Sequence, residues 1–153
     1  MNIFKLKAHA MARTVANDPL QKFMFRVTIP GLPSGLGFSK VSGLVREMGV
    51  TEYSEGGYQH NHKLSGKEKV EPVTCERGEY ASKELEIIYK KMMLDPNART
   101  TVIIEHLDKY GQAKRTFKLA QAWVSKWEGS DLDAMSDDTA IERITIQFEH
   151  FID

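Results

Sequence analysis

The sequence predicts a mainly β domain, a β-barrel or strongly curved antiparallel sheet, with one flanking α-helix at about residues 81–94. Aromatic and β-branched residues alternate with polar ones near both ends of the chain, as they do in half-buried strands. One segment instead spaces its apolar residues three and four positions apart, which is typical of an amphipathic helix.

The first predicted strand is residues 23–29, and the turn-forming cluster at residues 30–35 closes it. Residues 38–47 and 50–55 are two further expected strands, with Gly49 as a break or bulge between them. The alternating apolar positions of the first strand are Phe23, Phe25, Val27 and Ile29.

The stretch that begins at Gly56 and Gly57 is the least regular part of the chain. Residues 58–69 have little to bury, so they are expected to form a long exposed loop or hairpin tip. Residues 70–75 return to strand character, and Pro72 favours the edge of a sheet because it lacks an N–H donor.

The predicted helix ends at Asp95–Pro96, since proline does not continue a helix. After it, residues 101–107 form an expected strand, and residues 108–111 a hairpin turn. The apolar face of the helix is formed by Leu85, Ile88, Tyr89 and Met92.

Two more strands are predicted near the C-terminus. Residues 115–128 form a long one, and residues 140–149 alternate cleanly after a polar loop at residues 129–138. The large residues of the long strand share odd positions, which places them in the core or at a subunit interface. They are Phe117, Leu119, Trp123 and Trp127.

The bulk composition is that of one globular domain. The chain has 153 residues, of which 41% are hydrophobic and 27% charged, and 21 basic residues balance 21 acidic ones. This balance gives no overall attraction to nucleic acid or to an anionic membrane surface. No apolar run approaches the roughly 20 residues of a membrane span, and no signal peptide is predicted. Cys75 is the single cysteine, so no internal disulfide is expected.

Candidate catalytic residues are few. His60 and His62 would share one face of a strand and touch one metal ion, but no third ligand stands at a familiar spacing. Cys75 lacks an activating neighbour, and a buried structural cysteine is expected. The acidic run at residues 130–138 lacks the glycine and closing glutamate of an EF-hand. The sequence therefore predicts no catalytic residue, cofactor or metal, with a metal-dependent enzyme using the two histidines as a weaker alternative.

Several segments, in order, resemble the tail-tube protein family of contractile phages and related injection systems. Residues 37–44 are similar to its GFSEVSGL segment, residues 52–57 to EYREGG, and residues 122–129 to AWPVKWEGP. The resemblance extends over about residues 18–151, with departures at Val124–Ser125 and Ser130. The residues that carry the motifs are Asp18, Pro19, Phe38, Gly43, Trp123, Trp127, Glu128 and Gly129.

The resemblance implies a tail-tube β-barrel domain at residues 19–153, preceded by an N-terminal extension at residues 1–18. Such subunits assemble into hexameric rings that stack into the hollow inner tube of a phage tail or injection particle, a conduit for DNA or protein cargo. The implied partners are other copies of the chain, a sheath protein, a baseplate hub, a tail terminator, and a tape-measure protein or cargo in the lumen, with no membrane. The implied location is a virion tail or injection particle assembled in the bacterial cytoplasm. The alternative is a non-catalytic tube cap or baseplate adaptor of the same machine.

The segment between residues 45 and 69 is poor in core residues, which favours an arm that reaches a neighbouring ring. We expect its central part to form the contact between rings or subunits. The residues predicted for this contact are Glu52, Tyr53, Glu55, Gly56, Gly57, Tyr58, His60, His62, Lys63 and Leu64.

Overall fold

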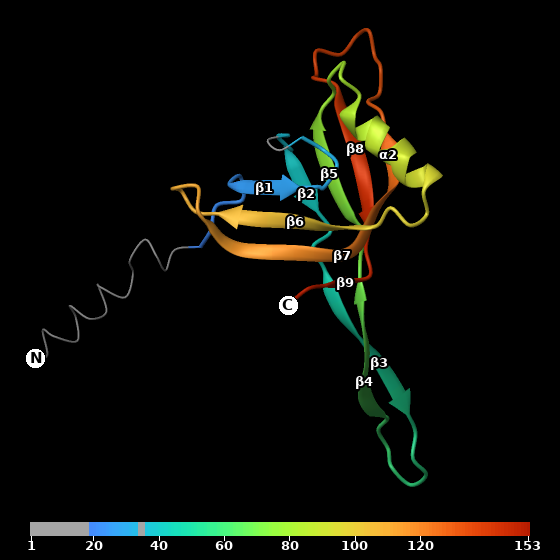
Figure 1. Cartoon of the computed structure of the whole chain (residues 1–153). Helices are drawn as coiled ribbons and strands as arrows, with labels where there is room; N and C mark the ends of the chain where they lie inside the picture. The colour runs from blue at the N-terminus through green and yellow to red at the C-terminus, as the bar shows by residue number, and fades with distance from the viewer. Residues whose placement is uncertain (1–18, 34–35) are drawn as a thin grey trace, which may run out of the picture.

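The computed structural model describes residues 19–33 and 36–153. The predicted N-terminal extension at residues 1–18, with Asp18, lies outside the described residues. Figure 1 shows the arrangement of the elements. They are β1 (Phe25–Thr28), β2 (Lys40–Ser42), β3 (Arg46–Tyr53), β4 (His62–Val70), β5 (Val73–Gly78), α2 (Glu84–Leu94), β6 (Thr100–Leu107), β7 (Ala113–Glu128), β8 (Ile141–Gln147) and β9 (His150–Phe151).

Seven strands form one antiparallel sheet in the order β1-β6-β7-β8-β5-β2, with β9 paired beside β7. Strands β3 and β4 pair with each other as a separate two-stranded sheet. The predicted class, mainly β with antiparallel pairing and one helix, is therefore confirmed for the described part of the chain. In that part the pairing path is open, and β1 and β2 are its edges.

Strand β7 divides the large sheet in two. Its first half pairs with β6 and its second half with β8. In Figure 1, β1, β6 and the first half of β7 run crosswise to β5 and β8. We call β1, β6, β9 and the first half of β7 the cross sheet, and β2, β5, β8 and the second half of β7 the upright sheet.

The core lies between these two sheets and α2. Val73 and Ile144 of the upright sheet and Leu119 of the cross sheet are fully buried, and Leu85 and Ile88 of α2 pack among them. The helix begins at Glu84, slightly later than predicted, after Lys83 in a left-handed conformation. No helix of the described part is long and apolar enough to cross a membrane.

Cys75 is part of this core, on β5. Burial raises the pKa of its thiol to about 12, because the charged thiolate is disfavoured away from water. The thiol is therefore protonated and unreactive at neutral pH, which agrees with the predicted structural cysteine.

Two of the three register shifts in the pairing of β7 change which side chains face the core. The pairing with β6 shifts by one residue near Gln121, whose φ is 53°, and the pairing with β8 shifts again between Val124 and Lys126. As a result Ala122 and Val124 are buried, whereas Trp123 is only half-buried. Of the two positions predicted for Trp123, the structure excludes the buried core, and a subunit interface stays a prediction. A core position is correct for Leu119, and Phe117 and Trp127 pack against the core.

The boundaries predicted for residues 38–69 are partly wrong. Of the break or bulge predicted at Gly49, the bulge is confirmed: β3 runs through Gly49 without a break, and two residues of β4, Gly66 and Lys67, oppose it. A Cβ atom on Gly66 would lie 3.1 Å from the Gly49 carbonyl oxygen, so the two backbones approach closely there. Most of the expected loop at residues 58–69 is strand β4.

The prediction of an edge strand around Pro72 is also wrong. Pro72 lies in the short connection between β4 and β5, outside both strands, so its missing N–H is not needed for sheet pairing. Strand β5 itself lies inside the sheet, between β8 and β2.

The backbone at motif position 43 requires glycine, and replacing Gly43 tests this. Its φ is 93°, and a Cβ atom there would lie 2.3 Å from the carbonyl oxygen of Pro72. We expect Gly43→Ala to lower the free energy of unfolding by about 1–3 kcal/mol or more, from the strained backbone and the clash. Urea denaturation checks this, with Gly37→Ala, where a Cβ meets no atom within 4 Å, as the control. Equal stability of the two variants would contradict the prediction.

Candidate assembly interface

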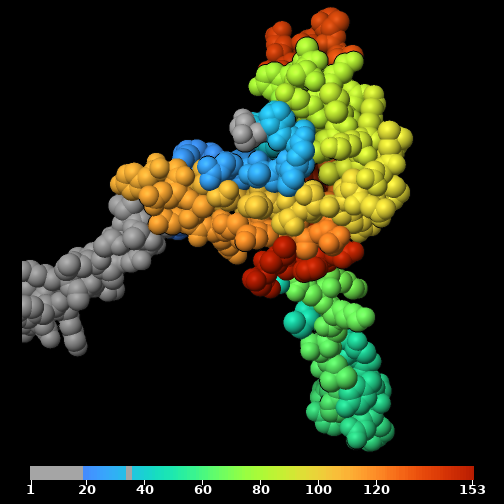
Figure 2. Space-filling model, in the orientation of Figure 1, coloured from blue at the N-terminus to red at the C-terminus, as the bar shows by residue number. Residues whose placement is uncertain are grey.

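Strands β3 and β4, with the connecting residues 54–61, form a hairpin that we call the arm. Figures 1 and 2 show that it projects from the body of the molecule, at the end opposite to the loop of residues 129–140. Strand β3 follows β2, and strand β4 leads into β5. The arm therefore extends the upright sheet beyond the core.

The arm exposes apolar side chains that an isolated domain has no reason to leave in water. Met48 and Val50 are 61% and 64% exposed, and Tyr58 and Leu64 are 56% and 53% exposed. A two-stranded hairpin with neither face covered is marginally stable in water. The register places Met48 and Val50 on one face of the hairpin and Leu64 on the other, so both faces of the arm expose apolar side chains to contact with another protein.

The outer end of the arm is held by a stack of rings. The His62 imidazole lies between the rings of Tyr53 and Tyr58, with centroids 4.9 Å and 4.8 Å away. Its Nε2 atom lies 3.1 Å from Oε2 of Glu55. These contacts cross from one strand to the other and include the connecting residues, so they give the tip a defined shape without a core.

The structure brings together all ten residues that the sequence predicted for the contact. Lys63 Nζ lies 3.7 Å from Oε1 of Glu52 across the strands, and the ring of His60 meets Tyr58 edge-on. Gly57 has a φ of 84°, which glycine adopts readily in a turn. All ten lie in the outer part of the arm, between Glu52 and Leu64.

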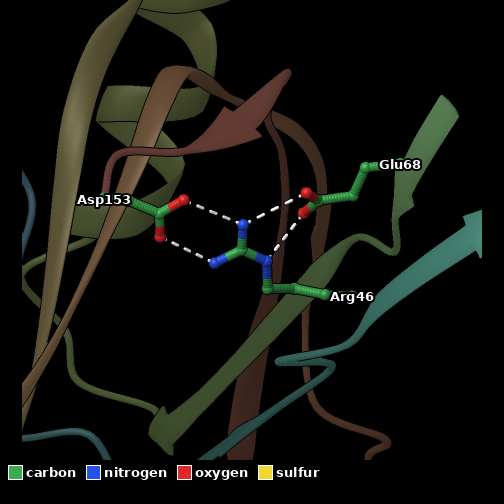
Figure 3. Close-up of polar contacts among 3 residues, drawn as sticks. All are labelled: Arg46, Glu68 and Asp153. Carbon is green, nitrogen blue, oxygen red and sulfur yellow. Dashed lines mark hydrogen bonds and ion pairs between the residues drawn. The ribbon is translucent and has the colours of Figure 1, made fainter.

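The base of the arm is fixed by an ionic clamp that the sequence analysis missed. Figure 3 shows the Arg46 guanidinium between the carboxylates of Glu68 and Asp153. Arg46 donates to Glu68 over 2.7 and 3.1 Å, and to Asp153 over 2.8 and 3.0 Å. Arg46 also lies over the ring of Phe151, at 5.2 Å from its centroid. The clamp thus joins both strands of the arm to the C-terminal segment.

The clamp is expected to open in acid. Hydrogen bonds from Arg46 lower the pKa of the Glu68 and Asp153 carboxyls from their ordinary values of 4.5 and 3.8. A carboxyl with a lowered pKa stabilises the folded arrangement above its ordinary pKa, and this contribution is lost as the pH falls through the lowered value. The arm is therefore expected to be firmly oriented at neutral pH and to become mobile in acid.

Hydrogen exchange of the arm amides, corrected for the intrinsic effect of pH, checks this prediction. Arg46→Ala is expected to show at neutral pH the fast exchange that the natural protein shows only in acid. Lys63→Ala, which removes the pair at the outer end, is the control and is expected to leave the base protected. Unchanged protection in Arg46→Ala would show that the clamp does not orient the arm.

A second charged group lies inside the body and was also missed. Arg77 and Glu142 are each about 4% exposed, and Nε of Arg77 lies 3.7 Å from Oε1 of Glu142. Nη1 of Arg77 donates to Glu84 of α2 over 3.0 Å, and the indole N–H of Trp127 donates to Glu142 over 3.2 Å. The group joins α2 to the upright sheet. Arg77 on β5 and Glu142 on β8 stand at the alternate positions that face the core, and the sequence could have indicated this pairing through that alternation.

Four other motif residues make structural contacts. Phe38 packs against the core, and Gly129 lies under the Trp127 ring, where a Cβ atom would be 3.1 Å from Cη2. Glu128 accepts from Arg143 over 3.2 Å, and the Arg99 guanidinium lies over the Trp123 ring at 5.8 Å. Pro19 is exposed at the start of the described residues.

The described residues contain no group of three or more His, Cys, Asp or Glu side chains placed to hold a metal ion. His62 is engaged by Tyr53, Tyr58 and Glu55, as described above.

Comparisons with known proteins show the family of the chain. Residues 21–152 match the family model described as T4-like virus tail tube protein gp19. No match was found among curated protein sequences.

Solved structures of contractile injection systems contain similar chains. One is in the sheath–tube complex of the extracellular contractile injection system PVC in its extended state (21% identity, TM-score 0.77, 92% of this chain and 95% of that chain covered). Another is in the PVC sheath/tube terminator in its extended state (22%, 0.79, 89% and 96%). A third is in the baseplate of the anti-feeding prophage (22%, 0.77, 89% and 95%). At these identities the likeness establishes the fold, whereas the family match over nearly all residues establishes kinship: the chain belongs to the T4-like virus tail tube protein gp19 family.

Proposed function

We propose that this chain is a structural tail-tube subunit, which assembles into hexameric rings that stack into the hollow inner tube of a contractile phage tail or injection particle. The observation that carries the proposal is the arm. It exposes apolar and aromatic side chains on a shaped tip, and its base is fixed by the Arg46 clamp, as contact with another subunit requires. The ten residues between Glu52 and Leu64 form the contact with the next ring.

Contact within a ring uses the open edges of the sheet. Strands β1 and β2 each pair on one side in the described structure, so each leaves a row of backbone donors and acceptors on the other. Ring closure between copies covers such edges without requiring any other partner.

We also propose further partners, and the sheath–tube, terminator and baseplate assemblies that contain similar chains support the coarser part of this proposal. The further partners are a sheath protein outside the tube, a baseplate hub and a tail terminator at its ends, and a tape-measure protein, DNA or effector protein in the lumen. The tube domain spans residues 19–153, after an extension at residues 1–18, and assembles in the bacterial cytoplasm into a virion tail or injection particle. The role is structural, and no residue is assigned to catalysis.

Negative-stain electron microscopy of the purified protein across a concentration series tests the proposal. Stacked rings with a central hole are expected at high concentration. If the purified protein remains monomeric even when purified baseplates are added as nuclei, the proposal is overturned. In purified natural particles the chain is expected to be among the most abundant proteins, whereas a tube cap or baseplate adaptor would be scarce.

A further inference from the structure

Two aromatic side chains are exposed at one end of the cross sheet. Phe23, just before β1, is 74% exposed, and Tyr110, in the turn between β6 and β7, is 78% exposed. Both lie at the same end of the molecule, because the backbone N–H of Leu107, next to that turn, donates to the carbonyl oxygen of Met24 over 2.8 Å. Neither ring belongs to the core cluster of the described residues. Large aromatic side chains left in water are typical anchors of protein interfaces.

A groove lies at the other end of the same sheet, beside the C-terminal half of α2. It consists of two cavities of about 340 and 270 Å³, which share Met92, Ala98 and Arg99 in their walls. The half-buried Trp123 lines the first cavity, and Thr100 lines the second. We call the two cavities together the α2 groove. Its apolar walls suit the side chains of another protein.

The exposed rings and the groove lie at opposite ends of strand β6. Thr100 begins the strand beside the groove, and Leu107 ends it beside the rings. Eight residues of a strand span about 25 Å, so the rings do not reach the groove of their own subunit. A surface that fits a different surface of the next copy makes a heterologous contact, and such contacts close into rings.

The direction of β6 agrees with a contact inside one ring. Strands β1 and β6 run crosswise to the arm (Figure 1). If the arm reaches the next ring, the two ends of β6 point to the two neighbours within the same ring. The exposed rings of one copy then face the α2 groove of the next.

The two surfaces also match in charge. Nζ of Lys109 lies 5.5 Å from the centroid of the Tyr110 ring, so this end carries a cation beside an aromatic side chain. Asp95 lies in the wall of the groove, and among the described residues its carboxylate accepts only the backbone N–H of Asn97. This carboxylate is therefore open to a cation from another copy.

We propose that Phe23 and Tyr110 of one copy insert into the α2 groove of the next copy in the ring, with Lys109 beside Asp95. This rests on the proposed tube function. The anchors continue the edge of the sheet, because β1 follows Phe23 directly and leaves one side unpaired in the described structure. The contact also gives Trp123 a place at a subunit interface.

Chemical cross-linking tests this contact. Gln112→Cys places a thiol beside the exposed turn, and Asn97→Cys places one at the rim of the groove, between Pro96 and Ala98. The natural Cys75 is buried and provides little background. The double variant and each single variant are treated with a short bis-maleimide, as free subunits and as tubes, and are then separated on a denaturing gel.

In tubes of the double variant we expect a ladder of cross-linked species that ends at the size of one ring. Free subunits and the single variants are expected to stay monomeric. A ladder that runs past one ring would place the contact between rings, cross-linked single variants would show that like ends meet, and an unlinked double variant in tubes would show that the two ends lie apart. Each of these results overturns the inference and leaves the tube function standing, whereas a natural protein that forms no tubes contradicts the function itself.

Removing the two rings measures their contribution. Phe23→Ser with Tyr110→Ser is expected to raise the protein concentration needed for ring formation about tenfold or more, because a few aromatic anchors supply most of the energy of an interface. Leu132→Ser with Met135→Ser is the matched control, since it removes two side chains that are 90% and 92% exposed from the loop of residues 129–140. Sedimentation velocity measures ring formation, and circular dichroism checks the fold. If both variants form rings at the same concentration, the rings are not anchors and the inference is overturned.

Discussion

Replacing residues 51–64 by Asn-Gly is expected to abolish the stacking of rings while the body of the subunit stays folded. The change removes the outer arm and joins Val50 to Ser65, which already face each other across the strands, through a two-residue turn. No residue of the removed segment belongs to the core, so we expect the free energy of unfolding to change by no more than about 1 kcal/mol. Electron microscopy measures stacking, and urea denaturation measures stability.

A second variant separates the length of the arm from the chemistry of its tip. Tyr53→Ser with Tyr58→Ser keeps every backbone position but removes both rings that stack on His62. We expect this variant to stack weakly and only at higher protein concentration. Normal tubes from the shortened protein would show that the arm is not the contact between rings.

Arg77→Ala is expected to destabilise the subunit by about 3–5 kcal/mol, because it leaves the Glu142 carboxylate buried without its cation. The change also removes the hydrogen bond from Arg77 to Glu84, which holds α2 on the upright sheet. Urea denaturation of unassembled protein is the direct measurement. We expect the α2 amides to lose protection from hydrogen exchange first.

Arg143→Ala is the matched control, since it removes an arginine from an exposed network on the opposite face of the same sheet. Its effect on stability is expected to be much smaller, because solvent screens exposed ion pairs. Arg77→Met combined with Glu142→Gln is expected to recover much of the loss, because the amide still accepts from Trp127 and no charge remains buried. If Arg77→Ala is as stable as the natural protein, the buried charges are not coupled.

The elements that the sequence predicts well are those with one buried face. Strand β8 buries every second side chain and helix α2 buries side chains at helical spacing, so the periodicity of both can be recognised in the sequence. Strand β4 could not be predicted in this way, because its side chains are exposed or only partly buried and so carry no apolar alternation. The sequence could not exclude a core position for Trp123, because a bulge changes the face of a strand without changing its composition.

The contact role of the arm stays a prediction, and its geometry could not be predicted from the sequence. The ten residues predicted for the contact lie together in the arm, yet nothing in the sequence indicates that His62 lies between two tyrosine rings. The Arg46 clamp joins residues separated by up to 107 positions, and only the folded chain brings Asp153 to the base of the arm. Pairings of this kind depend on the path of the chain and not on local patterns.

Strand β7 determines how the subunit unfolds under mechanical force. A single run of 16 residues supplies a strand to both sheets, so neither sheet is complete without it. Detaching one sheet exposes the core that it shares with the other and frees half of the strand on which the other depends. The body is therefore expected to unfold as one cooperative unit. Force applied to the upright sheet reaches the cross sheet through covalent backbone, and not only through side-chain packing.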